Sequence, residues 1–398
     1  MLTLEDALER ILDGLGETDA EDVLLTDALG RSPVVRRLVA AGDVPPFDNS
    51  AMDGYAVLAA DGVALRRVMG ESRAGAASVP RVEPGTAVRV MTGAPMPAGA
   101  DTVVPIEEAE ERGSELVLEA APAIGAHIRS AGHDVAAGAE VRLPDAALSP
   151  ATIGLLAALG IATVSVHRRP RVAILSTGDE LVAPGLPLRP GQIHDANGPA
   201  LSAAVSEIGG EPILLEPAPD DPAIIEERLH EGARRADLLI VSGGVSVGRH
   251  DHVRSAIERL GSLDFWRIAV QPGKPLAFGR IGERPIIGLP GNPVSALVTF
   301  ELFVRPALRR MQGLTGNGRP RVRARIDEEI RTDAMRRAFV RVRVEADGDG
   351  YRATSAGGQS SSQLLPLAAA NGLLVVPEGV AATVPGSTYE VIVTGVLA

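Results

Sequence analysis

The chain of 398 residues contains no cysteine. This absence excludes disulfide bonds, thiolate metal sites and thiol nucleophiles together. It also agrees with a reducing compartment. An excess of positive charge is missing as well, because the net charge at pH 7 is −12. So acidic a chain has little attraction for a phosphate backbone, and we expect no nucleic-acid partner.

Long apolar segments are also missing. The longest, residues 151–166, is shorter than the ~20 residues that a membrane-spanning helix needs. The first 15 residues combine early acidic side chains with apolar residues three and four positions apart, which indicates an amphipathic helix and not a signal peptide. We therefore expect a soluble, cytoplasmic protein with no membrane partner.

The sequence pattern changes along the chain, and its length predicts about two to four domains. Residues 43–143 are rich in glycine and proline and carry short strand-like segments, which predicts a compact β domain. Strands and helices alternate from residue 169 to about residue 311, which is typical of a mostly parallel sheet with covered faces. From residue 319 onward the period is two, which predicts a small β barrel or sandwich. The expected fold class is multidomain α/β plus β.

The alternating region gives specific boundaries. We expect strands at residues 171–177, 212–216, 237–242 and 285–289, and helices at residues 198–208, 222–235, 253–260 and 293–310. Arginines also alternate in residues 335–344, and we interpret that pattern as the solvated face of a strand.

Three of the expected buried segments each end in a glycine-rich turn, and they span residues 171–180, 236–251 and 284–296. Ligands of parallel α/β sheets bind beyond the carboxyl ends of the strands, so the three turns describe one composite pocket. Bare backbone amides suit an anion, above all phosphate. The carboxylates of Asp179, Glu180 and Asp251 fall in the same region, which indicates chemistry on a phosphorylated ligand with a divalent cation.

Two of the turns also have a purely structural interpretation. The acidic residues after Gly178 suit a helix N-terminus, where they match the dipole. Asn292 is a good helix cap and Pro293 a good first helical residue. Pro290 and Gly291, however, aim that helix end into the same pocket, which favours an anion site.

The turn at residues 242–251 is more specific, because two adjacent glycines are costly for stability. His250 and His252 flank Asp251 and have a spacing that zinc can use, but no third ligand is evident, so we favour solvated or phosphate-contacting histidines. Lys274 lies between two prolines and either meets a phosphate as a fixed charge or is an exposed side chain in a hairpin turn.

Three loops of the glycine- and proline-rich region carry further polar residues. DNSAMDGYA contributes Asp53, MTGAP contributes Thr92, and HIRSAGHD contributes Arg129 and Asp134. Each loop is also explained as a turn, and a salt bridge between Arg129 and Asp134 is expected.

Eight segments, taken in order, match the motifs of one known family: FDNSAMDGYA (47–56), MTGAPMPAGAD (91–101), IRSAGHD (128–134), LSTGDEL (175–181), VSGGVSVGRHD (241–251), QPGKPLAFG (271–279), GLPGNPVSALVTFELFVRP (288–306) and QSSSQLLPLAAANGL (359–373). Through them the chain resembles the MoeA/gephyrin family of molybdopterin molybdenumtransferases. The match covers almost the whole chain.

The resemblance implies a homodimer in which the β domain of one protomer lies over the α/β pocket of the other. It implies five segments: an N-terminal helix packing on the α/β domain (1–19), a linking domain (20–40 with 141–168), a Gly/Pro-rich β domain (41–140), a MogA-like molybdopterin-binding α/β domain (169–318) and a C-terminal β barrel (319–398).

Members of that family insert molybdenum from molybdate into adenylylated molybdopterin and release AMP, using Mg²⁺. The resemblance therefore implies catalytic roles for Asp53, Thr92, Glu180 and Asp251, and Glu180 and Asp251 would also hold Mg²⁺. It implies substrate-binding roles for Arg129, Asp134, Ser176, Thr177, Gly178, Asp179, Asp220, Ser242, Gly243, Gly244, Ser246, Gly248, Lys274, Pro290, Gly291, Asn292 and Pro293.

Two positions depart from the family pattern, because lysine is common where Gln271 and Arg267 stand. The missing charge at Gln271 would weaken one phosphate or molybdate contact and leave more of that interaction to Lys274. The resemblance also implies two kinds of partner, a MogA-type adenylyltransferase and the molybdoenzymes that receive the cofactor.

Two other functions compete with molybdenum insertion. In one, the α/β domain performs adenylyl transfer or pyrophosphate hydrolysis, as related domains do in MogA and CinA-like proteins. The loops with Asp53 and Thr92 argue against it, because they resemble the additional domain of the insertase. In the other, the chain is a non-catalytic scaffold of the gephyrin kind. The acidic set of Asp53, Glu180 and Asp251 argues against that.

Overall fold

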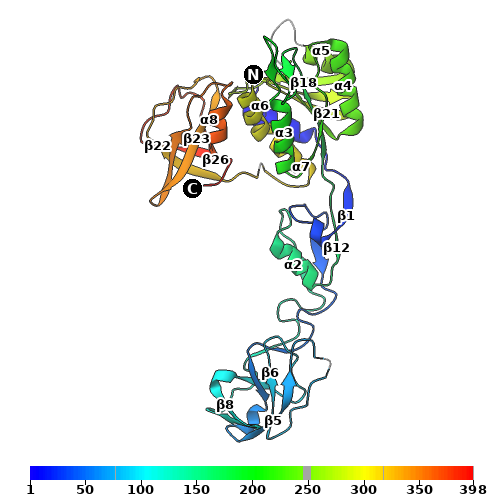
Figure 1. The fold of residues 1–398 in the computed structure, drawn as a ribbon, viewed down its shortest axis with the longest axis vertical. Coiled ribbons are helices and arrows are strands. Elements are labelled where there is room, and N and C mark those ends of the chain that lie inside the picture. Colours follow the sequence, from blue (N-terminus) through cyan, green and yellow to red (C-terminus); the bar gives the residue numbers. More distant parts are fainter. Residues whose placement is uncertain (77, 245–251, 317, 398) are drawn as a thin grey trace. The chain divides into compact units, whose positions relative to one another are not determined.

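The computed structural model describes residues 1–76, 78–244, 252–316 and 318–397. The described chain divides into two compact units (Figure 1). The first comprises Met1–Asp22, Gly30–Val34 and Ser165–Ala398, and the second comprises Val23–Leu29 and Val35–Val164. The strands β1 (Ala20–Leu24) and β12 (Thr163–His167) carry the chain from one unit to the other.

A six-stranded sheet forms the centre of the first unit, in the order β16–β13–β17–β21–β20–β18. Its strands are β13 (Arg171–Ser176), β16 (Glu211–Leu214), β17 (Leu238–Ser242), β18 (Gly261–Arg267), β20 (Pro275–Ile281) and β21 (Arg284–Leu289). The first four in the sheet order are parallel, and β20 runs antiparallel to both of its neighbours, β21 and β18. The expectation of a mostly parallel sheet is therefore confirmed.

Helices cover both faces of this sheet, since successive strand residues point to opposite sides. Ile174 and Ile240 face a core built with α1 (Leu4–Asp13), α3 (Asn197–Glu207), α6 (Pro293–Thr299) and α7 (Arg305–Met311). Ala173 and Leu239 face the opposite core, which contains α4 (Pro222–Arg235) and α5 (His252–Leu260) (Figure 1). The helix expected at residues 293–310 is interrupted by a π-helical turn, η4 (Phe300–Val304), between α6 and α7.

A closed five-stranded barrel follows the α/β sheet in the sequence. Of the two expected architectures, the barrel is therefore confirmed and the sandwich is not. Its strands pair in the order β23–β24–β22–β26–β25, and β25 returns to β23. Their bounds are β22 (Arg321–Ile326), β23 (Arg337–Asp347), β24 (Gly350–Ser355), β25 (Gly372–Val376) and β26 (Ser387–Val393), with α8 (Leu364–Ala369) between β24 and β25. The strand β19 (Val270–Gln271) pairs in parallel with β23.

The interpretation of residues 335–344 as a solvated face is wrong at Arg341, which is 1% exposed. Arg343, two residues later, is exposed as expected. The alternation is real, but the strand closes a barrel and presents Arg341 to an adjoining loop, where backbone carbonyls replace water as partners for its guanidinium.

The second unit contains another six-stranded sheet, in the order β7–β4–β6–β5–β9–β8. Its strands are β4 (Gly54–Val57), β5 (Arg66–Ser72), β6 (Thr86–Val90), β7 (Thr102–Pro105), β8 (Ala109–Arg112) and β9 (Glu115–Leu118). Two short pairs accompany it, β3 (Asn49–Ser50) with β10 (Ile128–Arg129) and β2 (Arg37–Val39) with β11 (Glu140–Arg142); the unit also contains α2 (Pro150–Ala158). The expected β domain is confirmed. Within the described residues, no helix combines the length and apolar character that crossing a membrane requires.

Candidate active site

The carboxyl ends of three parallel strands lie in register at one edge of the α/β sheet. Ser176 of β13 pairs with Ser242 of β17, and Ser242 pairs with Leu289 of β21. The turns that follow these residues therefore meet at that edge, where ligands of such sheets bind. The two serines are each only 1% exposed, so their hydroxyls belong to the interior of the site.

Glycine is required where these turns approach one another. A Cβ atom on Gly243, whose φ is +97°, would lie 2.4 Å from the carbonyl oxygen of Thr177. One on Gly244 would lie 2.5 Å from Cγ2 of Val253, and one on Gly291 would lie 3.4 Å from Cα of Gly243. The three turns are thus in backbone contact, and a side chain at Gly243 or Gly244 would force them apart.

Carboxylates gather at the ends of β13 and β16. The Glu180 side chain folds over the turn, so that a Cβ on Gly178 would lie 2.6 Å from its Oε2 atom. Asp179 accepts a hydrogen bond through Oδ1 from the backbone N of Asp220 at 2.9 Å. The backbone N of Gly178 donates to the carbonyl of Ala218 at 3.0 Å, which joins the two loops. Three expected site residues from two loops, Asp179 and Glu180 from one and Asp220 from the other, therefore share one acidic surface.

Asn197, the first residue of α3, is a site residue that the sequence reasoning missed. Its Nδ2 donates to Oγ of Ser242 at 2.7 Å and to the carbonyl of Gly291 at 2.8 Å. Oγ of Ser242 donates in turn to the carbonyl of Pro290 at 3.3 Å. Through these hydrogen bonds Asn197 holds the turns after β17 and β21 next to the start of α3. The available signal was an asparagine just after Asp195, at the beginning of an expected helix.

Three buried side-chain oxygens at this edge have no hydrogen-bond partner among the described residues. They are Oγ of Ser176, Oγ1 of Thr177 and Oδ1 of Asn197. A buried polar atom left without a partner costs ~1–3 kcal/mol, so such atoms rarely collect by chance. Their position at the strand ends indicates a polar ligand.

The helix after β21 begins as the sequence predicts. Asn292 is its N-cap residue and Pro293 is its first residue, and the Asn292 side chain makes no capping hydrogen bond. The backbone N of Val294 donates to the carbonyl of Ser361 at 3.2 Å. One of the free amides at this helix end is therefore used by a loop between β24 and α8.

That loop, residues 357–363, belongs to a segment of the resemblance to which the sequence reasoning gave no role. Buried Arg341 shapes it, since its NH2 group donates to the carbonyls of Gly358 and Ser360 at 2.9 and 3.2 Å. The barrel thereby delivers a serine-rich loop to the start of α6. Nothing in the local pattern reveals this, because the contact joins residues far apart in the sequence.

Lys274 is the only lysine in a chain with 38 arginines. β20 runs antiparallel to β21 with Ala277 opposite Gly288, so the start of β20, next to Lys274, lies at the carboxyl end of β21. The turn also packs on α6, because a Cβ on Gly273 would lie 2.3 Å from Cγ2 of Thr299. The Lys274 side chain is exposed and forms no hydrogen bond or ion pair with the described residues.

Asp53 and Thr92 meet in the second unit. Oδ1 of Asp53 accepts from the backbone N of Thr92 at 2.6 Å and from its hydroxyl at 2.9 Å. These bonds, the backbone one first, lower the pKa of Asp53. Two residues that the sequence places 39 positions apart therefore act as one charged group.

Arg129 and Asp134 lie in the same unit. Arg129 pairs with Asn49 in the β10–β3 ladder, and the backbone N of Asp134 donates to the carbonyl of Val44 at 2.9 Å. The expected salt bridge between Arg129 and Asp134 is not formed, although both are described. Both side chains are exposed, where hydration competes with pairing.

Three expected site residues, Ser246, Gly248 and Asp251, lie outside the described residues, as does His250. Within the described ranges, no group of three or more histidine, aspartate and glutamate residues is placed to hold a metal ion. A magnesium site formed by Glu180 and Asp251 stays a prediction.

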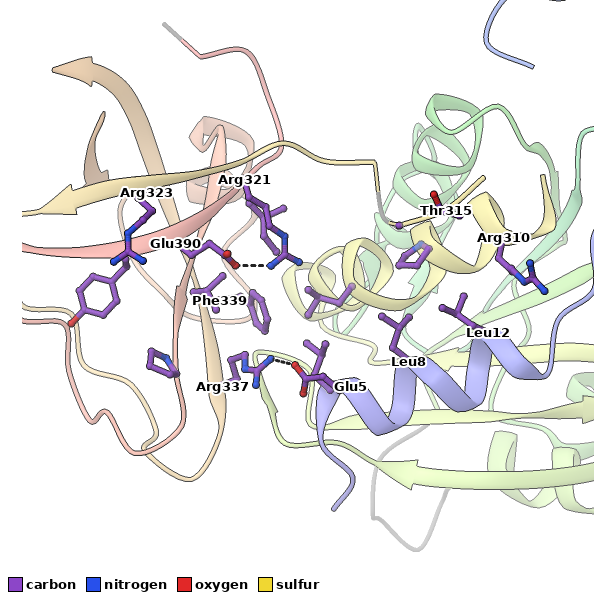
Figure 2. A pocket seen from close by; sticks show the side chains of 18 of the residues that line it. Glu5, Leu8, Leu12, Arg310, Thr315, Arg321, Arg323, Arg337, Phe339 and Glu390 are labelled. Carbon is purple, nitrogen blue, oxygen red and sulfur yellow. Dashed lines mark hydrogen bonds and ion pairs between the residues drawn. The ribbon is translucent and has the colours of Figure 1, made fainter. Parts of the chain in front are cut away.

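A pocket of about 950 Å³ lies away from this edge, between α1, α7 and the barrel (Figure 2). Leu8 and Leu12 of α1 line it together with Phe339 of β23. The ion pairs Arg337–Glu5 and Arg321–Glu390 also border it. It contains none of the expected site residues, so its size does not make it the catalytic site.

Comparison with known proteins matches three family models in order along the chain. They are the MoeA N-terminal region (domain I and II) at residues 2–160, a probable molybdopterin binding domain at residues 173–310, and the MoeA C-terminal region (domain IV) at residues 323–394. Together they cover most of the chain.

Individual relatives agree with these models. Molybdopterin molybdenumtransferase 2 of Mycobacterium tuberculosis is 41% identical over 376 residues, covering 89% of this chain and 92% of the relative. Gephyrin of Dictyostelium discoideum is 33% identical and covers 99% of this chain, which spans 62% of that longer protein. The crystal structure of a molybdopterin biosynthesis MoeA protein of Pyrococcus horikoshii is 33% identical, with a TM-score of 0.82 over 99% of both chains. The chain is therefore a member of the MoeA family.

Proposed function

We propose that the chain is a molybdenum insertase, which transfers molybdenum from molybdate into adenylylated molybdopterin and releases AMP. One observation carries the proposal: the unpartnered buried oxygens of Ser176, Thr177 and Asn197 line the carboxyl edge of the sheet. That edge lies in the segment matched by the molybdopterin binding domain. The names of the relatives, at about 40% identity, support the same activity.

Each kind of polar group at this edge suits a different part of the proposed ligands. Backbone amides in the turns after β17 and β21 suit the phosphates, which accept hydrogen bonds. The ammonium of Lys274 suits a second oxyanion. The carboxylate of Glu180, with Asp251, would hold Mg²⁺, a hard cation that prefers such oxygens. When bound, the ion would neutralise charge on the phosphoanhydride that is cleaved.

Asp53, Thr92, Arg129 and Asp134 all belong to the second unit. We infer that this unit completes the site of the other protomer in a homodimer, with the domain boundaries expected from the sequence. The charged carboxylate of Asp53, which accepts two hydrogen bonds from Thr92, suits the binding of a polar substrate. A MogA-type adenylyltransferase would supply the substrate and molybdoenzymes would receive the product, in the cytoplasm.

The test is direct. The purified protein is incubated with adenylylated molybdopterin and Mg²⁺, with and without molybdate, and both AMP release and pterin-bound molybdenum are measured. Release of AMP that depends on molybdate, with molybdenum retained on the pterin, is the expected result. Bound substrate that never turns over would instead establish a scaffold. In a separate incubation with ATP and molybdopterin but no molybdate, consumption of ATP would establish an adenylyltransferase.

A further inference from the structure

Gln271 uses its side chain to join the α/β sheet region to the barrel. Its Oε1 atom accepts a hydrogen bond from the backbone N of Asp333 at 2.8 Å. The same residue pairs with Ala338 in the short parallel ladder of β19 and β23. Position 271 therefore contributes a structural link, and Lys274 is left as the cationic side chain of this turn.

The backbone of Asp333 is consequently bonded to the turn that carries Lys274, whereas its carboxylate is held within its own loop. Its Oδ1 accepts from the backbone N of Met335 at 2.9 Å, and its Oδ2 accepts from Nε of Arg336 at 2.7 Å. These two bonds are the main causes of the lowered pKa of Asp333, and the charge of Lys274 lowers it further. The carboxylate is 38% exposed, so solvent and ligand can both reach it.

The charge of Lys274 can act on two kinds of anion. One is the carboxylate of Asp333, whose backbone is bonded to the same turn and which forms an ion pair with Arg336 but none with Lys274. The other is any oxyanion that enters at the carboxyl end of β21. Two negative groups near one ammonium repel each other, so the carboxylate weakens the binding of the incoming ion.

Building on the function proposed above, we propose that Asp333 sets the oxyanion affinity of the site, because its carboxylate competes with a tetrahedral dianion such as molybdate for Lys274. The effect is moderate, since both groups are exposed and screened by solvent. Removing the charge of Asp333 should tighten oxyanion binding about two- to fivefold, the range of an exposed charge interaction. A purely structural role predicts the opposite sign, because loosening the turn would weaken binding.

The single lysine makes the test independent of turnover. An amine-acylating reagent is applied to the full-length protein, and acylation of Lys274 is measured by mass spectrometry with increasing molybdate. Molybdate should protect Lys274 in the wild type. In Asp333→Asn, half-protection should need about two- to fivefold less molybdate.

Two further variants keep the result interpretable. Asp333→Glu retains the charge and should leave half-protection near the wild-type value, even if Asp333→Asn melts earlier. Asp349→Asn removes a carboxylate from the hairpin between β23 and β24 and should also change nothing. Unchanged or weaker protection in Asp333→Asn, with normal protection of the wild type, overturns this inference alone. A wild type whose Lys274 molybdate never protects overturns the oxyanion role of Lys274 as well.

Discussion

Thr92 holds the carboxylate of Asp53 with two donors at once, its backbone N–H at 2.6 Å and its hydroxyl at 2.9 Å, both to the same oxygen. Two hydrogen bonds to one carboxylate favour its charged form. The pair therefore presents a fixed negative charge in the second unit.

Replacing Thr92 with valine removes the hydroxyl and keeps the backbone donor. We expect the pKa of Asp53 to rise toward its ordinary value in Thr92→Val and to return in Thr92→Ser. A carboxylate with a lowered folded pKa stabilises the protein above its unfolded pKa, and that contribution is lost as the pH falls through the folded pKa. NMR titration of the Asp53 carboxyl carbon measures the shift. An unchanged pKa in the valine variant would show that the backbone bond suffices.

Replacing Glu180 with glutamine keeps the shape of the side chain that folds over Gly178 and removes its charge. We expect the variant to fold and to bind adenylylated molybdopterin but to release little AMP, because it lacks the negative oxygen that we propose as a ligand of Mg²⁺. Pterin binding and AMP release are measured on the same preparation. AMP release near the wild-type rate would remove Glu180 from the catalytic set.

Gly243 and Gly185 offer a matched comparison. Both have a positive φ, +97° and +92°, but a Cβ on Gly243 meets Thr177 whereas one on Gly185 meets nothing within 4 Å. Gly185→Ala should cost only the backbone strain of ~1–2 kcal/mol. Gly243→Ala should cost about 1–3 kcal/mol more and weaken pterin binding, because the turns must separate. Denaturant unfolding measures both variants. Equal losses of unfolding free energy in the two variants would mean that the turns can separate at no energetic cost.

Asp237 links the two strands β13 and β17 at their amino ends. Burial raises its pKa, but hydrogen bonds from Arg168 and Arg171 outweigh burial and lower the pKa to about 2. The resulting stabilisation, about 2 kcal/mol, should be present at neutral pH and disappear as the pH falls from about 4 to about 2. Asp237→Asn should therefore unfold more easily than the wild type at pH 7, with Asp349→Asn as the control. A difference in unfolding free energy between the wild type and Asp237→Asn that persists at pH 2 would contradict this assignment.

The sequence was most informative where one strand determines its own environment. Buried strands ending in glycine turns predicted the parallel sheet and the shared edge of Ser176 and Ser242, because apolar runs and turn residues are local signals. The barrel loop against α6 was not predictable in this way. It depends on Arg341 meeting carbonyls about 17 residues away in the chain, and alternation alone cannot tell a buried arginine from a solvated one.

The role of Asn197 and the structural link made by Gln271 were not predicted, for a related reason. Both act through hydrogen bonds to residues more than forty positions distant, and an amide side chain carries no periodicity that reveals its partner. The π-helical turn at Phe300–Val304 was invisible for the same reason, since its apolar residues also fit an uninterrupted helix.

The two-residue strand β19 has a consequence for how such a protein can be divided. It belongs to the segment between β18 and β20, yet it pairs with the barrel, and Phe339, Leu373 and Ile392 of the barrel contribute to the same core as α1 and α6. Residues 173–310 and 323–394 are matched by separate family models. In this structure the two segments share the β19–β23 strand pairing and one hydrophobic core. A cut at the boundary between those models would leave one fragment with an orphaned strand and the other with bare apolar surface, so a truncated α/β fragment should be prone to self-association.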